Sequence, residues 1–61
     1  MNRETWEAAY IASAMSSRYD FTERSAKRQA ARAWLYWNTE RGANEMLSPT
    51  DAFRSDAEEW A

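Results

Sequence analysis

Residues 24–37 read RSAKRQAARAWLYW, and this stretch decides the fold of the chain. Four cations are spaced among alanines with no acid between them, and two tryptophans and a tyrosine follow. Alanine and arginine are among the strongest helix formers, so we predict a long helix here. Short alanine side chains would let one face of this helix pack closely against a neighbour. The cations would form a basic face on the other side.

This helix is predicted to begin near residue 23, after a break in the chain. Asp20 followed by Glu23 matches a capping box, and Thr22 is the rival N-cap, with Phe21 placed as a hydrophobic staple. The expected inward face contains Ala26, Ala30, Ala33, Trp34 and Trp37, flanked by Ala31 and Leu35. Gly42 could end the helix as a C-cap, but helix-forming residues after it favour continuation to about residue 46.

An earlier helix is predicted over about residues 3–18. Asn2 is a suitable N-cap, and Glu4 and Glu7 lie in the first turns, where the helix dipole favours acids. The helical period places one apolar face on Ala8, Ile11, Ala12, Met15 and Tyr19. An adjoining stripe contains Trp6, Tyr10 and Ala14. The apolar surface of this helix is therefore expected to be broad.

A third, short helix is predicted over about residues 49–60. Ser48 provides an N-cap, Pro49 suits the first helical position, and Asp51 follows three residues after the cap. Phe53, Ala57 and Trp60 would form one apolar stripe. We therefore expect an all-α fold in which residues 1–61 form a single small domain, a helical hairpin followed by a short C-terminal helix.

The core of such a domain looks small. The chain has 61 residues, no cysteine and few large aliphatic side chains, and domains of this size are usually marginal without a disulfide, a metal or oligomerisation. We therefore expect the fold to be completed by self-association, as a homodimer. The residues expected to form the core or the self-association surface are Trp6, Tyr10, Ala30, Trp34, Trp37, Phe53 and Trp60.

Catalytic chemistry is not expected. The chain has no histidine to act as a general base and no cysteine to act as a nucleophile, and its single glycine cannot form a phosphate-binding loop. No cofactor or metal site is predicted, because paired carboxylates such as Glu58 and Glu59 are common on solvated helix faces. No segment resembles a membrane span or a signal peptide, so we expect a soluble, cytoplasmic protein without a membrane partner.

The basic face has two interpretations. Arg24, Arg28 and Arg32 repeat at four-residue intervals, with Lys27 beside them. The start of the second helix could therefore contact nucleic acid as a recognition helix. However, the net charge is -2 and the sequence pI is about 5. Domains that bind the phosphates of nucleic acid usually carry more cations than acids. The face could instead be solvated and paired with the chain's own acids.

We favour a protein partner over nucleic acid. Tyr36 falls away from the predicted core, beside Arg32, and tyrosine, tryptophan and arginine are enriched at binding hot spots. The predicted partner-binding residues are Arg24, Arg28, Arg32 and Tyr36. In general character the chain resembles small, acidic, cysteine-free accessory proteins of phages and plasmids that bind host proteins. The residues themselves predict a non-enzymatic regulator or inhibitor that binds another protein, and a small nucleic-acid-binding regulator is the alternative.

Overall fold

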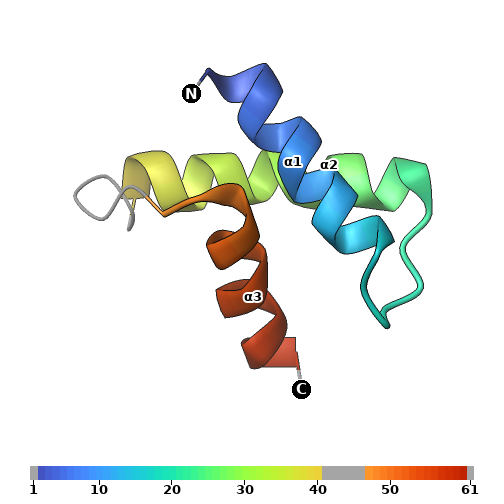
Figure 1. Cartoon of the computed structure of the whole chain (residues 1–61). Helices are drawn as coiled ribbons and strands as arrows, with labels where there is room; N and C mark the ends of the chain where they lie inside the picture. Colours follow the sequence, from blue (N-terminus) through green and yellow to red (C-terminus); the bar gives the residue numbers. More distant parts are fainter. Residues whose placement is uncertain (1, 41–46, 61) are drawn as a thin grey trace.

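The computed structural model describes residues 2–40 and 47–60 of the chain, and there it contains three α-helices packed compactly (Figure 1). Helix α1 spans Arg3–Met15, α2 spans Glu23–Leu35 and α3 spans Pro49–Trp60. A π-helical turn, η1 (Tyr36–Glu40), continues α2 directly. The predicted all-α class is confirmed for the described residues.

Helix α1 begins where the sequence predicted and ends three residues earlier. The Asn2 side chain accepts a hydrogen bond from the Thr5 backbone N–H at 2.8 Å, which makes it the N-cap. At the other end the Ser17 hydroxyl donates to the Ala14 carbonyl at 2.7 Å and accepts from the Tyr19 N–H at 3.2 Å. Serine side chains compete with the helix for backbone groups, so the predicted extension to residue 18 was wrong.

Only part of the broad apolar surface predicted for α1 is buried. The buried residues are Trp6, Tyr10 and Ala14 of the adjoining stripe, and Trp6 and Tyr10 were predicted core residues. On the other predicted face Ile11 and Tyr19 pack against the core, whereas Ala8, Ala12 and Met15 are exposed. Burying two large aromatic rings removes more apolar surface from water than burying alanines and a methionine, so the aromatic stripe occupies the core.

Helix α2 begins after Thr22, the alternative N-cap predicted from the sequence. The Thr22 hydroxyl accepts from the Ser25 N–H at 3.1 Å, and the Ser25 hydroxyl accepts from the Thr22 N–H at 2.9 Å. This reciprocal pair forms the capping box, so Asp20 is not the N-cap. The two predicted ends of this helix, Gly42 and Met46, lie outside the described residues.

Helix α3 has the predicted bounds. The Ser48 hydroxyl accepts from the Asp51 N–H at 3.2 Å, and Pro49 opens the helix. Of its predicted apolar stripe, Phe53 is buried, Ala57 is half-buried and Trp60 is exposed. The helix also buries Pro49 and Ala52, so its inward face is displaced towards its N-terminal half.

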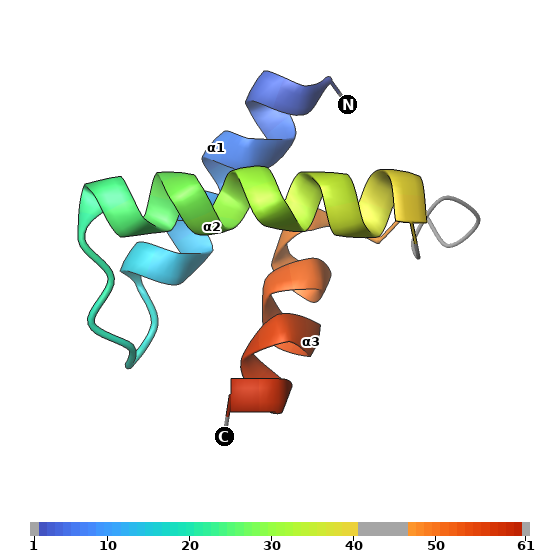
Figure 2. The same cartoon turned by 180° about the vertical axis from the view of Figure 1, so that it is seen from behind.

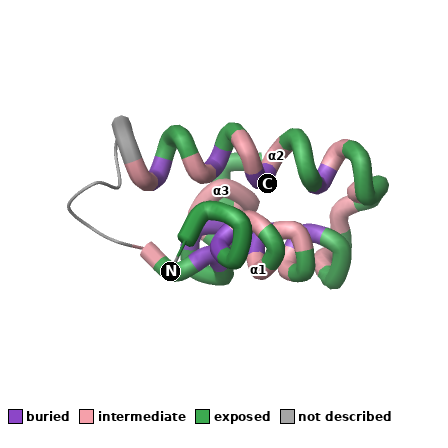
Figure 3. Tube along the Cα trace, turned by 90° about the horizontal axis from the view of Figure 1, so that it is seen from above, coloured by how far each residue is buried: buried purple, intermediate pink, exposed green. Residues whose placement is uncertain are grey.

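The three helices form two layers. Helix α2 forms one layer, and α1 and α3 lie together on the same side of it (Figures 2 and 3). Helices α1 and α2 pack on each other across a short turn, but α1 crosses α2 obliquely, and α3 packs against α1 (Figure 1). The core between the layers contains Trp6, Tyr10, Ala14, Ala26, Ala30, Ala33, Trp37, Ala52 and Phe53.

Candidate functional site

The basic face of α2 points away from the core. Ala26, Ala30 and Ala33 are buried, and Arg24, Arg28 and Arg32 are exposed. Since the helix repeats every ~3.6 residues, the three arginines form a ridge on the outer side of α2, with ~6 Å of rise between neighbours. This is the side of α2 nearest the viewer in Figure 2. We call these three residues the arginine ridge.

The arginine ridge is not neutralised by any acid in the described part of the chain. Over residues 2–40 and 47–60, Arg24, Arg28 and Arg32 make no ion pair and no side-chain hydrogen bond. Lys27, on the flank of α2, does pair with an acid, because its Nζ lies 3.1 Å from the Glu23 carboxylate. The solvated, self-paired interpretation of the basic face therefore fits Lys27 but not the arginines.

Tyr36 lies at one end of the ridge, in η1. Its ring packs edge-on against Trp37, with ring centroids 5.0 Å apart. Together with Arg32 it lines a surface hollow whose opposite wall comes from α3. Asp56, Glu59 and Trp60 supply that wall. The hollow therefore has a cation on one side, carboxylates on the other and an aromatic ring at each side.

Beneath this hollow, a polar cluster joins all three helices. The Asp56 carboxylate of α3 accepts a hydrogen bond from the Tyr10 hydroxyl of α1 and another, at 2.9 Å, from Trp37 Nε1. The Gln29 amide of α2 donates to the same Tyr10 hydroxyl at 3.3 Å. Because no buried side-chain polar atom in the described residues lacks a partner, this cluster is fully satisfied. It fixes the position of α3 relative to the other helices.

The environment of Tyr10 also changes its acidity. The side chain is fully buried, and burial is the main reason that the pKa of its phenol is raised above the ordinary value. The hydrogen bond to the Asp56 carboxylate acts in the same direction, because removing the phenolic proton would place two negative charges together. Tyr10 is therefore a structural donor and not a poised acid.

Most residues predicted for the core or for self-association are used inside the chain. Trp6, Tyr10, Ala30, Trp37 and Phe53 are buried. The two others lie nearer the surface. Trp34 is half-buried, with its ring edge-on to Trp6 at 5.6 Å. Trp60 is 41% exposed, and its other side packs against three rings, those of Tyr19, Phe21 and Phe53.

Sequence reasoning missed the role of Asp56, which was not among the residues predicted for the core. A signal was present. Asp56 lies three residues after Phe53 and four before Trp60, so it falls on the apolar stripe of its helix. An acid in that position needs donors, and Tyr10 and Trp37 were the candidates with an apolar body and a polar tip.

Three further findings bear on the class of site. The described residues contain no group of three or more acidic side chains placed to hold a metal ion. Within the same residues, every helix is too short or too polar to cross a bilayer. Comparison of the chain with protein-family models, curated proteins and solved structures gives no match. The surface of the chain is therefore the feature that bears on its function.

Proposed function

We propose that this chain is a non-enzymatic interaction module, a small regulator or inhibitor that binds another protein through the arginine ridge and Tyr36. The observation that carries this proposal is the exposure of three arginines that have no acidic partner in the described residues. The planar guanidinium of arginine binds a carboxylate most strongly when it donates two parallel hydrogen bonds to it. An acidic protein surface therefore suits this ridge.

The hollow beside Arg32 favours a protein partner over nucleic acid. Asp56 and Glu59 line its far wall, and their charges would repel a phosphate backbone that followed the ridge to Tyr36. A protein surface can present an acid to Arg32 and a donor to Glu59 at the same time. Tyr36 and Trp60 add aromatic area of the kind that anchors protein interfaces.

Affinity capture with purified variants tests the proposal. The ridge variant replaces Arg24, Arg28 and Arg32 by alanine. The control replaces Arg54, an exposed arginine on α3 whose Nη1 lies 3.8 Å from Asp51, by alanine. We expect the wild-type chain and the Arg54→Ala control to retain the same protein from a native-host extract. The ridge variant should lose it, although all three chains fold.

Nucleic-acid binding is the alternative function, and the ridge is the feature that favours it. Its test is the affinity of the wild-type chain for duplex DNA and for RNA over a salt series. Three phosphate contacts would give a slope of about -2.7 in log K against log salt on duplex DNA. If the wild-type chain shows a slope of that size and the ridge variant does not, the function is nucleic-acid binding and not protein binding. We expect no measurable affinity at ~150 mM salt.

A further inference from the structure

An exposed leucine lies in line with the arginine ridge. Leu35 was predicted to flank the inward face of α2, but its side chain is 50% exposed. It follows Arg28 by seven residues and Arg24 by eleven, and these intervals are close to two and three whole turns of an α-helix. Leu35 therefore lies on the outer side of α2 with the two arginines. We call Arg24, Arg28 and Leu35 the outer line of α2.

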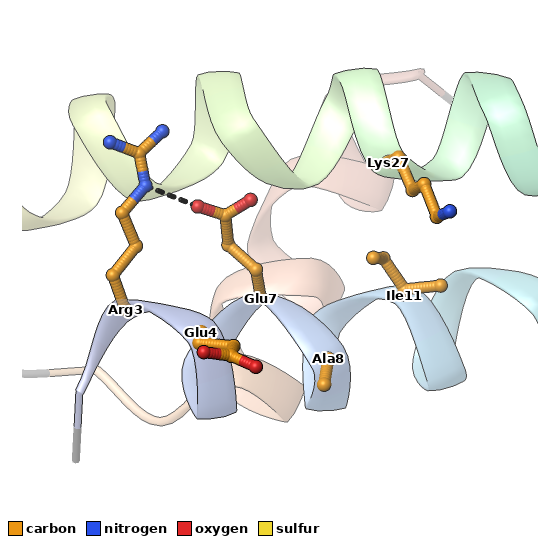
Figure 4. Close-up of a pocket in the computed structure, with 6 residues that line it drawn as sticks. All are labelled: Arg3, Glu4, Glu7, Ala8, Ile11 and Lys27. Atoms are coloured by element: carbon orange, nitrogen blue, oxygen red, sulfur yellow. Dashed lines mark hydrogen bonds and ion pairs between the residues drawn. The ribbon is translucent and has the colours of Figure 1, made fainter.

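Several other cations of the chain are paired within it. Figure 4 shows the hollow between α1 and α2, where Arg3 donates to the carboxylate of Glu7. Lys27 lines the same hollow and pairs with Glu23, one turn before it on α2. The arginine ridge has no such pair within the described residues. Its guanidinium groups can therefore bind carboxylates from outside the chain.

Charge and apolar surface are separated along the outer line. From the helical rise, Arg28 lies ~6 Å from Arg24 along the axis, and Leu35 lies ~10 Å beyond Arg28. A single exposed leucine is ordinary on a protein surface. Here the leucine lies at one end of a row of cations, so the face has a basic end and an apolar end. A partner that covers the whole face has to match both ends.

We propose that the outer line binds an acidic amphipathic helix of the partner protein. Its carboxylates pair with Arg24 and Arg28, and an aliphatic side chain of the same helix covers Leu35. This inference rests on the proposed function and specifies the partner of the same surface. The charge of the face is the reason for an acidic segment, because each guanidinium can donate two hydrogen bonds to a carboxylate.

The spacing of the outer line is the reason for a helix. A helix laid along α2 has the same rise per residue as α2 itself. Acids four residues apart on the partner helix therefore face Arg24 and Arg28, and an aliphatic residue seven positions further on faces Leu35. Amphipathic helices commonly bind other proteins through side chains at such intervals.

The chain's own acidic helix does not fit this pattern. Helix α3 exposes Asp51, Glu58 and Glu59, but it also exposes Arg54 between them. On the ridge of a second copy, Arg54 would meet other arginines. No aliphatic side chain of α3 larger than alanine is present to cover Leu35. The occupant is therefore a different protein and not a second copy.

Replacement of the leucine tests the apolar contact in the capture assay. Met15 on α1 is 49% exposed, nearly the same fraction as Leu35, so Met15→Ala is the matched control for Leu35→Ala. Loss of the half of the leucine side chain that a partner covers should weaken binding roughly fivefold. Leu35→Ala should therefore capture less of the same protein than wild type. Met15→Ala should capture the wild-type amount, and circular dichroism checks that both variants fold.

A designed peptide tests the chemistry of the partner without a host extract. The probe is a blocked, alanine-rich peptide of ~15 residues with two glutamates four positions apart and a leucine seven positions further on. Its affinity is measured from NMR shifts of the α2 amides. Two comparison peptides carry alanine for the leucine or lysines for the glutamates.

The wild-type chain should bind the leucine peptide roughly fivefold more tightly than the alanine peptide. Leu35→Ala should bind these two peptides equally, because the contact between the two leucines is then absent in both. The lysine peptide should not bind, and the ridge variant should bind none of the three.

Equal affinity of the wild-type chain for the leucine and alanine peptides overturns the proposal, and so does binding of the lysine peptide. Self-association that rises with protein concentration and is lost in the ridge variant also overturns it, since a second copy is then the occupant. If the ridge variant loses capture but Leu35→Ala does not, this inference fails and the proposed function stands. If the wild-type chain captures no protein, both fail.

Discussion

Tyr10 on α1 donates a hydrogen bond to the carboxylate of Asp56, 46 positions further along the chain on α3. The same carboxylate accepts from Trp37 Nε1 at 2.9 Å. Two core aromatic residues thus satisfy their polar atoms on one acid, and the acid keeps its charge solvated by donors. This single residue links the C-terminal helix to both of the preceding segments.

Removing that acid should destabilise the fold. Asp56→Ala leaves the Trp37 N–H without its acceptor and removes the acceptor of the Tyr10 hydroxyl. An unsatisfied buried donor costs about 1–3 kcal/mol, so we expect a loss of about that size or more. Chemical denaturation measures it, and Glu58→Ala on the exposed side of α3 is the control, expected within ~0.5 kcal/mol of wild type. Equal stabilities for Asp56→Ala and the control would show that this hydrogen-bonded cluster does not stabilise the fold.

Tyr10 predicts a loss of stability in alkali. Its pKa is raised in the folded chain by burial and by Asp56, and the ordinary pKa is about 10. Below pH ~10 the phenol is protonated in both states and contributes no pH dependence. Above it the unfolded chain releases the proton while the folded chain retains it, so unfolding becomes easier by up to about 1.4 kcal/mol per pH unit. Tyr10→Phe should show a shallower decline, and equal declines would contradict the assignment.

The alanine face of α2 should not tolerate larger side chains. Ala30 is fully buried between the layers, so Ala30→Leu should overpack the contact and cost about 1–3 kcal/mol. Ala12→Leu on the exposed side of α1 is the matched control and should change stability little at low protein concentration. Thermal unfolding compares them. An unchanged or higher melting temperature for Ala30→Leu would mean that the face is open to solvent.

Trp34 and Trp37 should differ in their contribution to stability. Trp37 is buried and bonded to Asp56, so Trp37→Ala should cost about 3–5 kcal/mol. Trp34 is half-buried and contacts Trp6 by its edge, so Trp34→Ala should cost less. Denaturant midpoints of the two variants give the comparison. A larger loss of stability for Trp34→Ala than for Trp37→Ala would show that the inward face of this segment has been assigned to the wrong side of the helix.

Local features of the chain could be predicted from the sequence, because their causes lie within a few residues. The caps at Asn2 and Ser48 depend on a side chain and a backbone N–H three positions apart. The alanine face of α2 was also predictable, because polar residues flank it and leave only one apolar face that could pack against the core. The arginine ridge follows from the same period, on the opposite side.

Features that depend on distant packing were not predictable in the same way. Helix α1 has two apolar stripes, and the sequence alone does not show which of them α2 and α3 can cover, although the aromatic stripe with Trp6 and Tyr10 has more apolar surface to bury. The role of Asp56 depends on donors 46 and 19 positions away. The end of α1 is different, because its cause is local: the Ser17 hydroxyl competes with the helix for the Ala14 carbonyl, but the helical period of the sequence continues past it and hides the end.

The central claim, that the arginine ridge and Tyr36 bind a partner and do not support the fold, is tested most directly by one comparison. The amount of partner captured from a native-host extract is measured for wild type and for Arg28→Ala, Arg32→Ala, Tyr36→Ala combined in one chain, after both are shown to be folded. Capture should fall at least ~10-fold, since truncating hot-spot side chains costs about 2 kcal/mol or more. A variant that folds and captures the same protein in the same amount would contradict the account.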